Sequence, residues 1–357
     1  MAIINLNVPH REVLIIINLN VPVNLNGNSI IAKKRAMDDE LREDLDALIE
    51  KSGSAIEMRK ESLAGSAQLV QEVRRIKSSQ MSNLDNIVFN ATKKLGRSGL
   101  KVFVAKKPID VAEYIRDIVG ERKIGIVPSP QTIEAEVMQA FFISNAVEVL
   151  SDKYVGQNKG MPFLHPYFPY PREKGRSPRS DAKSVIISAV AVTDTGALYL
   201  EKEEAEALKR GEVFVIATVD RLFSDADAEK VVELMEVASG GLIKAGRVEG
   251  KGHLILFDNN RMSAARSNIK DVLMCINCYA CSLYCPVYLT VGGLFGSPMM
   301  AGIGSVSAGY QSGVKMAVNR GLAYCTLCKR CETECPTGVP IVQLIGRMKE
   351  KAQVSGV

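Results

Sequence analysis

Short apolar runs and helix-spaced segments take turns along the middle of this sequence. The runs have the length and the Val and Ile content of buried strands, whereas the segments between them place apolar residues three and four positions apart, as amphipathic helices do. We expect strands at Leu100–Ala105, Ile124–Val127, Val147–Leu150, Ser184–Val192, Ala197–Leu200, Val213–Val219 and His253–Phe257. We expect helices at Asp110–Val119, Thr132–Ser144 and Asp225–Ala238. Strands that alternate with helices predict an α/β domain with a mostly parallel sheet, here over residues 99–262.

The N-terminal part of the chain has a different pattern of apolar and polar residues. Residues 1–36 form an atypical leader in which Ile3–Pro9 recurs as Ile16–Pro22, and its alternation of apolar residues with Asn favours extended strands, as a hairpin or an added edge strand. The alternative is a duplicated coding segment ahead of a chain that begins near Met37. Residues 37–98 are expected to be helical, with helices over Asp38–Glu50 and within Ser66–Lys94.

Composition narrows the class of protein. Of 357 residues, 46% are hydrophobic and 24% are charged, which excludes intrinsic disorder and a fibrous repeat. The net charge of +5 is too slight to predict nucleic-acid binding, but it is uneven, since ten Lys and Arg face four Asp and Glu from Arg261 onward. The N-terminal apolar stretches are broken by Asn and Pro and are shorter than the ~20 residues that a bilayer requires. We therefore expect no transmembrane segment.

The cysteines are the strongest chemical signal. All eight occur after residue 274, in two groups that both read C-x2-C-x2-C-x3-C-P. The groups are Cys275, Cys278, Cys281 and Cys285, and Cys325, Cys328, Cys331 and Cys335. A disulfide framework would spread its cysteines over a small secreted domain, and a signal peptide would precede that domain. Here the cysteines are confined to two short groups, and no signal-peptide pattern precedes them. The cysteines therefore indicate metal ligation in a reducing compartment, and we expect a cytoplasmic protein.

The spacing also predicts which cysteines share a cluster. In this motif the three closely spaced cysteines bind one [4Fe-4S] cluster, and the fourth, next to a proline, binds the other. We therefore assign a first cluster to Cys275, Cys278, Cys281 and Cys335, and a second to Cys325, Cys328, Cys331 and Cys285. Structural zinc is the alternative, because Zn²⁺ also takes thiolates, but zinc ribbons favour two separated C-x2-C pairs. The excess positive charge of this region would offset the negative charge of two clusters.

The segment Val272–Val314 contains no charged residue and many glycines. Charge is depleted both in buried cores and in interface cores, so the segment is either core around the clusters or a docking surface over Leu294–Ile303. Helices are expected on its C-terminal side, over Gln311–Ala323 and Val339–Ala352. We therefore predict an α-helical ferredoxin domain over residues 263–357.

Other motifs carry little chemistry. Thr193–Leu198 joins two predicted strands, and Asp-Thr-Gly there is either a hairpin turn or a cradle for a ligand. His253, at the start of a strand, and His165, in the proline-rich loop Gly156–Arg179, are assigned structural roles, and Asp258–Arg261 is taken as a loop. The sequence shows no P-loop, dinucleotide fingerprint or nucleophile elbow. We therefore name no catalytic residue.

Taken together, these motifs resemble a known family. An α/β domain with AVTDTGAL and HLILFDNNR, followed by CINCYACSLYCPVY, GGLFGSP and CTLCKRCETECP, is similar to the LUD-domain iron–sulfur proteins, the iron–sulfur subunits of the lactate-utilisation type of L-lactate oxidation. The resemblance implies an isomerase- or CoA-transferase-like LUD fold followed by the dicluster domain. It also implies partners: a heterodisulfide-reductase-like cysteine-rich subunit, and a second LUD protein or a flavoprotein.

Three functions are compatible with these features. The first is an electron-transfer subunit of a complex that oxidises a 2-hydroxy acid, with lactate as the expected substrate and no catalytic centre in this chain. The second is an electron-transfer subunit of a heterodisulfide-reductase-type complex. The third is a binding module in which the α/β domain senses a small acid and the clusters are structural or redox-sensing. They differ in partners and in whether the clusters turn over with substrate.

Overall fold

The computed structural model describes residues 2–8, 11–17, 53–142, 147–150, 182–296 and 298–356. Two strands, β1 (Ala2–Val8) and β2 (Arg11–Ile17), pair antiparallel at the N-terminus. The extended strand predicted for the first copy of the repeat is confirmed, whereas β2 lies mostly between the copies and most of the second copy is outside the described residues. The predicted helix over residues 38–50, the proline-rich loop and the histidines in the leader and that loop lie outside the described residues.

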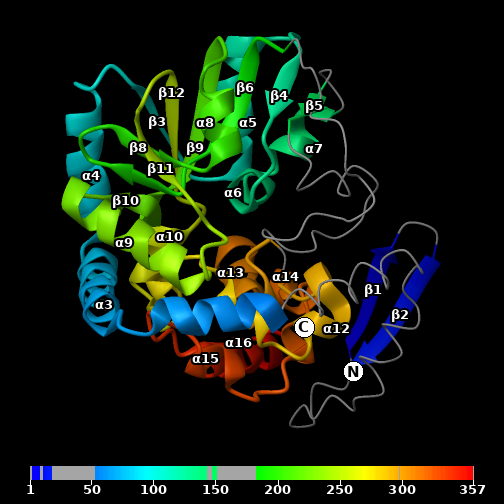
Figure 1. Ribbon diagram of the computed structural model, residues 1–357. Helices are drawn as coiled ribbons and strands as arrows, with labels where there is room; N and C mark the ends of the chain where they lie inside the picture. Colours follow the sequence, from blue (N-terminus) through cyan, green and yellow to red (C-terminus); the bar gives the residue numbers. More distant parts are fainter. Residues whose placement is uncertain are drawn as a thin grey trace.

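A six-stranded parallel sheet forms the centre of the α/β part (Figure 1). Its order is β3-β12-β9-β6-β4-β5, and every neighbouring pair is parallel. The strands are β3 (Lys101–Ala105), β4 (Ile124–Ile126), β5 (Val147–Val149), β6 (Ser184–Ser188), β9 (Glu212–Thr218) and β12 (His253–Phe257). Parallel sheets are covered on both faces, which is why these strands read as continuous apolar runs. The α/β fold with a parallel sheet is as predicted.

One face of this sheet packs on helices. Val111 and Ile115 of α5 (Pro108–Val119) share a core with Phe214 and Ile216 of the sheet. The predicted helix Thr132–Ser144 is wrong in one respect, because it is divided into α6 (Pro130–Glu134) and α7 (Val137–Phe142). The backbone turns to a φ of 54° at Glu136, which interrupts the helical hydrogen bonds.

The other face packs on a second sheet and on helices. This sheet has the order β10-β7-β8-β11. Its strands are β7 (Ala191–Thr193), β8 (Ala197–Leu200), β10 (Leu222–Phe223) and β11 (Gly246–Glu249), and the helices near it are α3 (Ala67–Ser82), α4 (Leu84–Leu95), α8 (Lys202–Ala207) and α9 (Asp225–Ala238). The single strand predicted over Ser184–Val192 is therefore two strands in different sheets. Helix α9 has the predicted bounds, and the Ser224 side chain caps it by accepting from the Asp227 amide.

From Arg261 onward, the described chain is helical (Figure 1). The α-helices are α10 (Arg261–Ala265), α11 (Ala280–Leu283), α12 (Tyr288–Val291), α13 (Ala301–Ser312), α14 (Val314–Asn319), α15 (Arg330–Thr333) and α16 (Ile341–Val354). Short 3₁₀ helices lie at Val219–Arg221, Lys270–Met274, Gly292–Leu294 and Leu322–Tyr324. Helix α16 matches the expected C-terminal helix within two residues at each end. The helix predicted over Gln311–Ala323 is confirmed only in its middle, as α14, and its bounds are wrong because α13 continues to Ser312 and α14 ends at Asn319.

The glycine-rich segment that includes α13 is core. Met300, Ala301 and Ile303 are at most 2% exposed, so the interpretation of residues 294–303 as a docking surface is wrong and the alternative, core around the cysteines, is correct. A Cβ at Gly302 would lie 2.7 Å from Ile345 Cδ1 of α16, and one at Gly309 would lie 2.5 Å from Met348 Cε. Glycine at these two positions lets α13 and α16 approach closely.

The N-terminal helices join the two parts of the molecule. The helix at residues 53–63 carries Arg59, whose buried guanidinium donates to Glu334 at 2.7 Å and to the Tyr284 hydroxyl at 3.3 Å. On α3, Arg74 donates to the carbonyl of Pro336 at 2.8 Å, directly after the last cysteine. One continuous apolar core runs from the sheet through α3 to the helices around the cysteines. Within the described residues, we find no helix whose length and apolar character would let it cross a bilayer.

Candidate metal centre

The two cysteine groups sit in loops with the same local structure. A 3₁₀ helix precedes the first cysteine of each loop, and a one-turn helix, α11 or α15, follows the second. Two non-glycine residues in each loop adopt positive φ at equivalent places: Asn277 (54°) and Tyr279 (55°) in the first loop, Leu327 (57°) and Lys329 (64°) in the second. Such backbone is costly and persists where the surroundings dictate it, often at functional sites.

Each loop also aims peptide N–H groups at sulfur. The amide of Asn277 donates to Cys275 Sγ at 3.3 Å, and the amide of Leu327 donates to Cys325 Sγ at 3.4 Å. The sulfur of the fourth cysteine in each group also accepts a hydrogen bond from a backbone amide. Cys285 accepts from the Tyr288 amide at 3.5 Å, and Cys335 accepts from the Val339 amide at 3.4 Å. Hydrogen bonds to cysteine sulfur are among the devices by which proteins hold and tune iron–sulfur clusters.

The mutual effects of the thiols on their pKa values show which of them are neighbours. Burial and then the thiol of Cys335 raise the pKa of Cys275 to about 11 and that of Cys278 to about 12. Burial and then the thiols of Cys275 and Cys278 raise the pKa of Cys281 well above its usual range. The structure thus places Cys335, from the second motif, beside the three cysteines of the first.

The reciprocal grouping holds for the second loop. Burial and then the thiols of Cys285, Cys325 and Cys328 raise the pKa of Cys331 to about 12. Burial raises the pKa of Cys285 to about 12, and the thiols of Cys325 and Cys328 add to the rise. The two sets are adjacent, because the thiol of Cys331 also raises the pKa of Cys281.

This donor set fits iron–sulfur clusters. Ionising four crowded thiols is unfavourable, because each thiolate is buried and lies near other negative charge. The positive charge of cluster iron bound to the thiolates would compensate for both costs. In the described part of the chain, no three His, Cys, Asp or Glu side chains converge on one point as a single bound ion requires. The ligands of a cube occupy its separate corners and need no such convergence.

The two loops differ in exposure. In the first loop, residues 276–280 are all buried against the α/β part. In the second loop, residues 326–330 are all exposed, among them Cys328, and Leu327 is 42% exposed. Lys329 and Arg330 add positive charge to that surface. The second loop therefore presents the more exposed surface of the two, with Cys328 exposed on it, although Cys285, Cys325 and Cys331 are buried.

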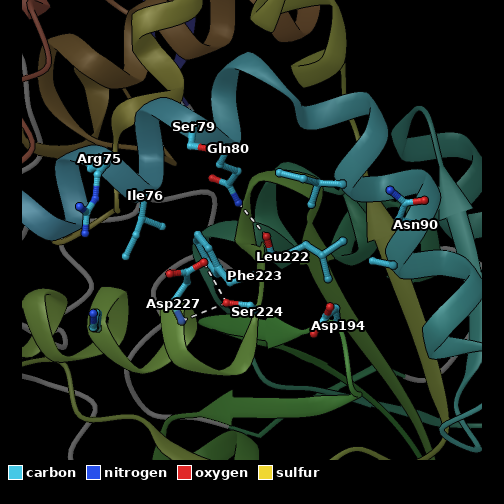
Figure 2. A pocket seen from close by; sticks show the side chains of 13 residues that line it. Arg75, Ile76, Ser79, Gln80, Asn90, Asp194, Leu222, Phe223, Ser224 and Asp227 are labelled. Atoms are coloured by element: carbon cyan, nitrogen blue, oxygen red, sulfur yellow. Dashed lines mark hydrogen bonds between the residues drawn. The ribbon is translucent and has the colours of Figure 1, made fainter.

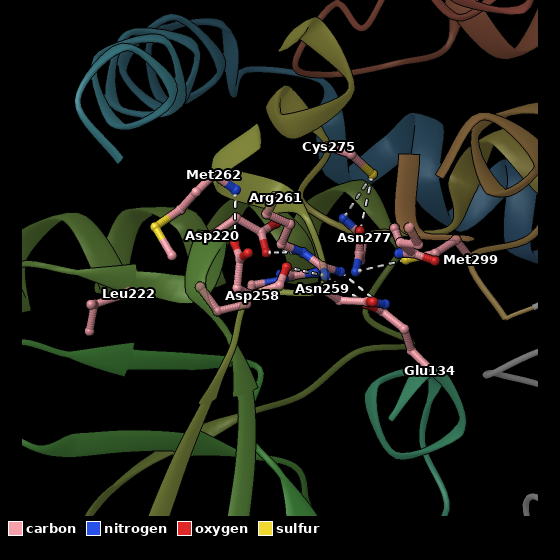
Figure 3. A network of polar contacts seen from close by, with 12 residues as sticks. Glu134, Asp220, Leu222, Asp258, Asn259, Arg261, Met262, Cys275, Asn277 and Met299 are labelled. Carbon is pink, nitrogen blue, oxygen red and sulfur yellow. Dashed lines mark hydrogen bonds and ion pairs between the residues drawn. The ribbon is translucent and has the colours of Figure 1, made fainter. Parts of the chain in front are cut away.

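A buried network of charged groups lies between the sheet and the first loop (Figure 3). Arg261 donates from Nη1 and Nη2 to the two carboxylate oxygens of Glu134, at 2.6 and 2.8 Å. Its Nε lies 2.8 Å from Asp220 Oδ1, in an ion pair without hydrogen-bond alignment. Asn259 donates to the same Glu134 at 2.9 Å, and Asn260 donates to the carbonyl of Gln311 in α13. The residues after β12 therefore fasten the α/β part to the cysteine-bearing helices.

The charged side chains of this network stabilise one another electrostatically. Burial opposes the charge of Asp220, but Arg261, Lys77 and Arg221 outweigh it and hold the pKa of Asp220 below its usual range. Burial lowers the pKa of Lys77 to about 8, although Asp220 works in the opposite direction. Lys77 and Arg221 both interact electrostatically with Cys275. Buried positive charge thus lies directly beside the first cysteine set.

Sequence reasoning missed this network. The run Asp258–Arg261 was expected to be a plain loop, yet Arg261 is only 2% exposed and holds Glu134 and Asp220. The four polar residues that follow a fully apolar strand were the available signal. Nothing in the spacing indicates that Glu134, in a distant helix, is the partner. His253 is structural as expected: Tyr114 contacts its Nδ1 at 2.8 Å, and Phe214 stacks on its ring.

The Thr193–Leu198 segment is a turn between β7 and β8, as one of its two interpretations predicted. Thr193 Oγ1 accepts from the Ala197 amide at 3.0 Å, and Gly196 adopts a φ of 100°. Beside the turn lies a cavity of about 470 Å³ between α3, α4 and the start of α9 (Figure 2). Two of its charged groups are paired with neighbours, since Asp194 pairs with Lys94 and Lys230 pairs with Glu72. We assign the cavity no role.

Comparison with known proteins gives two domain matches. Residues 90–210 match the model of the LUD domain, and residues 271–339 match that of the 4Fe-4S dicluster domain, which spans all eight cysteines. A crystal structure of a duf162 family protein from Deinococcus radiodurans aligns with 49% of this chain and 97% of its own, at 13% identity and a TM-score of 0.32. A likeness this weak carries no argument about the fold.

Two curated relatives cover most of the chain. The "Uncharacterized electron transport protein YkgF" of Escherichia coli is 25% identical over 341 residues, which cover 79% of this chain and 71% of that protein. "Lactate utilization protein B 2" of Bacillus mycoides is 24% identical over 333 residues, which cover 76% and 69%. This chain therefore carries a LUD domain followed by a 4Fe-4S dicluster domain, and it is related to lactate utilization protein B and to YkgF.

Proposed function

We propose that this protein is an electron-transfer subunit of a complex that oxidises a 2-hydroxy acid, with lactate as the expected substrate, and that it relays electrons through two [4Fe-4S] clusters. The observation that carries the proposal is the presence of two complete cysteine sets in equivalent loops, with amides aimed at the sulfurs. The names of the relatives, which refer to electron transport and lactate utilisation, supply the direction.

We assign the ligands crosswise. The first cluster belongs to Cys275, Cys278, Cys281 and Cys335, and the second to Cys325, Cys328, Cys331 and Cys285. The proximity of Cys335 to the first loop and of Cys285 to the second supports this assignment. We further infer that residues 263–357 form an α-helical ferredoxin domain and that the LUD domain, residues 99–262, has the isomerase- or CoA-transferase-like fold. Residues 37–98 would then be a helical region behind the leader, residues 1–36.

The polypeptide supplies the environment for electron transfer. When bound, the clusters supply one-electron carriers, so two of them match the two electrons that a 2-hydroxy acid loses on becoming a 2-oxo acid. Lys77 and Arg221 place buried positive charge near Cys275, which stabilises added negative charge there. The exposed second loop is the side from which a redox partner would exchange electrons. The expected partners are a cysteine-rich heterodisulfide-reductase-like subunit and a second LUD protein or flavoprotein, in the cytoplasm.

Metal content and ligation are tested first. Protein purified without oxygen should contain about eight iron and about eight sulfide per chain, because two cubes need four of each. Cys285→Ser should give the same electron paramagnetic resonance changes as Cys331→Ser, and Cys335→Ser the same changes as Cys281→Ser. If Cys285→Ser matches Cys281→Ser instead, ligation is sequential. Zinc in place of iron would overturn the proposal.

The substrate is tested in the intact complex. The protein should be isolated anaerobically with its natural partners and mixed with L-lactate, D-lactate or glycolate while cluster absorption is followed. Bleaching by one of these acids supports the proposal, and no bleaching by any of them contradicts it. Partners that reduce disulfides, together with reoxidation of the clusters by a disulfide substrate, would favour the heterodisulfide-reductase-type alternative, in which paired motifs of this kind also occur.

A further inference from the structure

The fourth cysteines of the two motifs differ in how the chain after them is held. Helix α12 begins shortly after Cys285, and the carbonyl of Pro286 accepts from the Thr290 hydroxyl of that helix at 2.7 Å. After Cys335, the next helix, α16, begins only at Ile341. Local structure therefore holds the chain beyond the first motif, whereas the chain beyond the second motif is held by side chains from elsewhere in the protein.

Two arginines of the N-terminal helices contact the residues on both sides of Cys335. Arg59 donates to the Glu334 carboxylate at 2.7 Å and also donates to the carbonyl of Glu334. Arg74 of α3 donates from its Nε to the carbonyl of Pro336 at 2.8 Å. This carbonyl is equivalent to the one that a hydroxyl of α12 satisfies in the first motif. In the second motif, Arg74 supplies the donor that the local helix supplies in the first.

The α/β part holds Arg59 itself in place. The side chain is buried, at 3% exposed, and the helix at residues 53–63 packs tightly on the end of α9. A Cβ at Gly240, just beyond α9, would lie 2.8 Å from the amide nitrogen of Arg59. The same guanidinium donates to the hydroxyl of Tyr284, directly before Cys285, at 3.3 Å. One buried side chain thus contacts the residues that precede both fourth cysteines.

We propose that Arg59 and Arg74 are positioning residues that hold Cys335 at the first cluster. The proposal rests on the proposed function, because it assumes two clusters with crosswise ligands. Cys335 follows a loop whose other three cysteines bind the second cluster, so contacts from outside that loop are needed to keep it at the first. Both arginines lie outside residues 90–210 and 271–339, which match the two domains. The proposal therefore gives the helices ahead of the LUD domain a role in metal binding.

A loosened ligand makes one iron of a cube labile. When a one-electron oxidant takes an electron from an oxidised [4Fe-4S]²⁺ cluster, the cluster can release that iron as Fe²⁺ and become [3Fe-4S]⁺, which three cysteines hold. The iron that leaves is the one bound to the loosened cysteine. Each hydrogen bond from Arg59 or Arg74 opposes the displacement of Cys335, so its removal should favour this reaction at the first cluster alone.

Arg74→Met tests the proposal, because Arg74 is exposed and the variant should fold. Full-length protein that holds both clusters is treated with ferricyanide, a one-electron oxidant, and the three-iron cluster is followed by electron paramagnetic resonance. We expect the first cluster to lose iron about tenfold faster than in the wild type, and the second at an unchanged rate. Arg74→Lys keeps a donor and should be closer to the wild type. Arg75→Met, the same change at the next exposed residue of α3, should leave both rates unchanged.

Arg59 is tested by Arg59→Gln, which removes the charge and most of the donors. We expect the same selective loss of iron from the first cluster. Because Arg59 is buried, the denaturant midpoint is measured beside the rates: a general loss of stability would speed iron loss from both clusters, whereas loss of a positioning contact acts on one. Lys60→Gln is the matched control, since Lys60 is exposed and pairs with Glu57, and it should behave as the wild type.

The spectra of Cys281→Ser and Cys331→Ser identify the cluster that has lost iron. Equal acceleration at both clusters, or none in Arg74→Met, would overturn the proposal while leaving crosswise ligation untouched. Selective loss from the second cluster would show that Cys335 binds that cluster, and it would overturn the ligand assignment of the proposed function together with the proposal.

Discussion

Individual residues in this protein carry buried charge where the neighbouring sequence is apolar. Arg261, Glu134 and Asp220 are all under 10% exposed, and they lie between a parallel sheet and a cysteine loop. A buried ion pair adds little net stability, because desolvation offsets the attraction, but the loss of one partner leaves an unpaired charge. We therefore expect removal of one partner of a buried ion pair to lower the free energy of unfolding more than removal of both partners.

This asymmetry can be measured at Glu134. Glu134→Gln removes the carboxylate that accepts two hydrogen bonds from Arg261, and we expect it to lower the free energy of unfolding by about 3–5 kcal/mol. The double variant with Arg261→Met should recover only part of this loss, because buried Asp220 then loses its ion pair with Arg261. As a control, Glu72→Gln breaks a partly exposed pair with Lys230 and should cost no more than about 1 kcal/mol. Denaturant midpoints measured without oxygen give the comparison, and equal costs at Glu134 and Glu72 would contradict it.

At the level of elements, sequence patterns predicted most of the α/β part. β12 and α9 have the predicted bounds because β12 is an uninterrupted apolar run, α9 has a clear helical period, and each starts at a polar residue. Prediction failed at α13, since glycine lowers helix propensity and the helix exists through packing on α16. It also failed for Ser184–Val192, because one apolar run serves two sheets and nothing local marks the change.

The packing of α13 gives a prediction at this level. A Cβ at Gly304 would lie 1.8 Å from the carbonyl oxygen of Gly296, and backbone cannot move aside cheaply. Gly304→Ala should therefore destabilise the protein by at least about 2 kcal/mol and reduce its iron content. Gly346→Ala is the matched control, because no atom outside the neighbouring backbone of α16 lies within 4 Å of that Cβ, and it should stabilise the protein by about 0.5–1 kcal/mol. An unchanged midpoint for Gly304→Ala would contradict the packing.

At the level of the whole molecule, the two cysteine loops differ in exposure: residues 276–280 are buried and residues 326–330 are exposed. The chemistry of the cysteines could be predicted from spacing alone, because the motif itself carries it. The placement of the cysteine loops could not be predicted from the sequence. It depends on contacts between the α/β part and the cysteine-bearing helices, made by the helix at residues 53–63, α3 and the residues after β12. The predicted docking segment, residues 294–303, was uncharged because it is buried, and the exposed surface lies at Leu327, Lys329 and Arg330.

That surface leads to a prediction about partners. An exposed apolar residue, Leu327, followed by two exposed cations fits an acidic partner, whose approach positive charge accelerates. Lys329→Glu with Arg330→Glu should lower the rate of electron exchange with an acidic carrier protein at least about tenfold at low salt and flatten its dependence on ionic strength. Lys209→Glu, an exposed change in the LUD domain, should leave the rate unchanged. Stopped-flow measurements decide, and an equal effect at Lys209 would contradict the assignment.

The unequal enclosure of the two loops also sets the order in which metal enters and leaves. Residues 276–280 of the first loop are buried, so we expect iron bound there to exchange more slowly than iron at the second loop. The second loop lies open at Cys328, so peroxide and chelators reach it first, and it can be reloaded without unfolding. Protein aged in air should therefore pass through a half-loaded form that retains the enclosed site and has lost the open one.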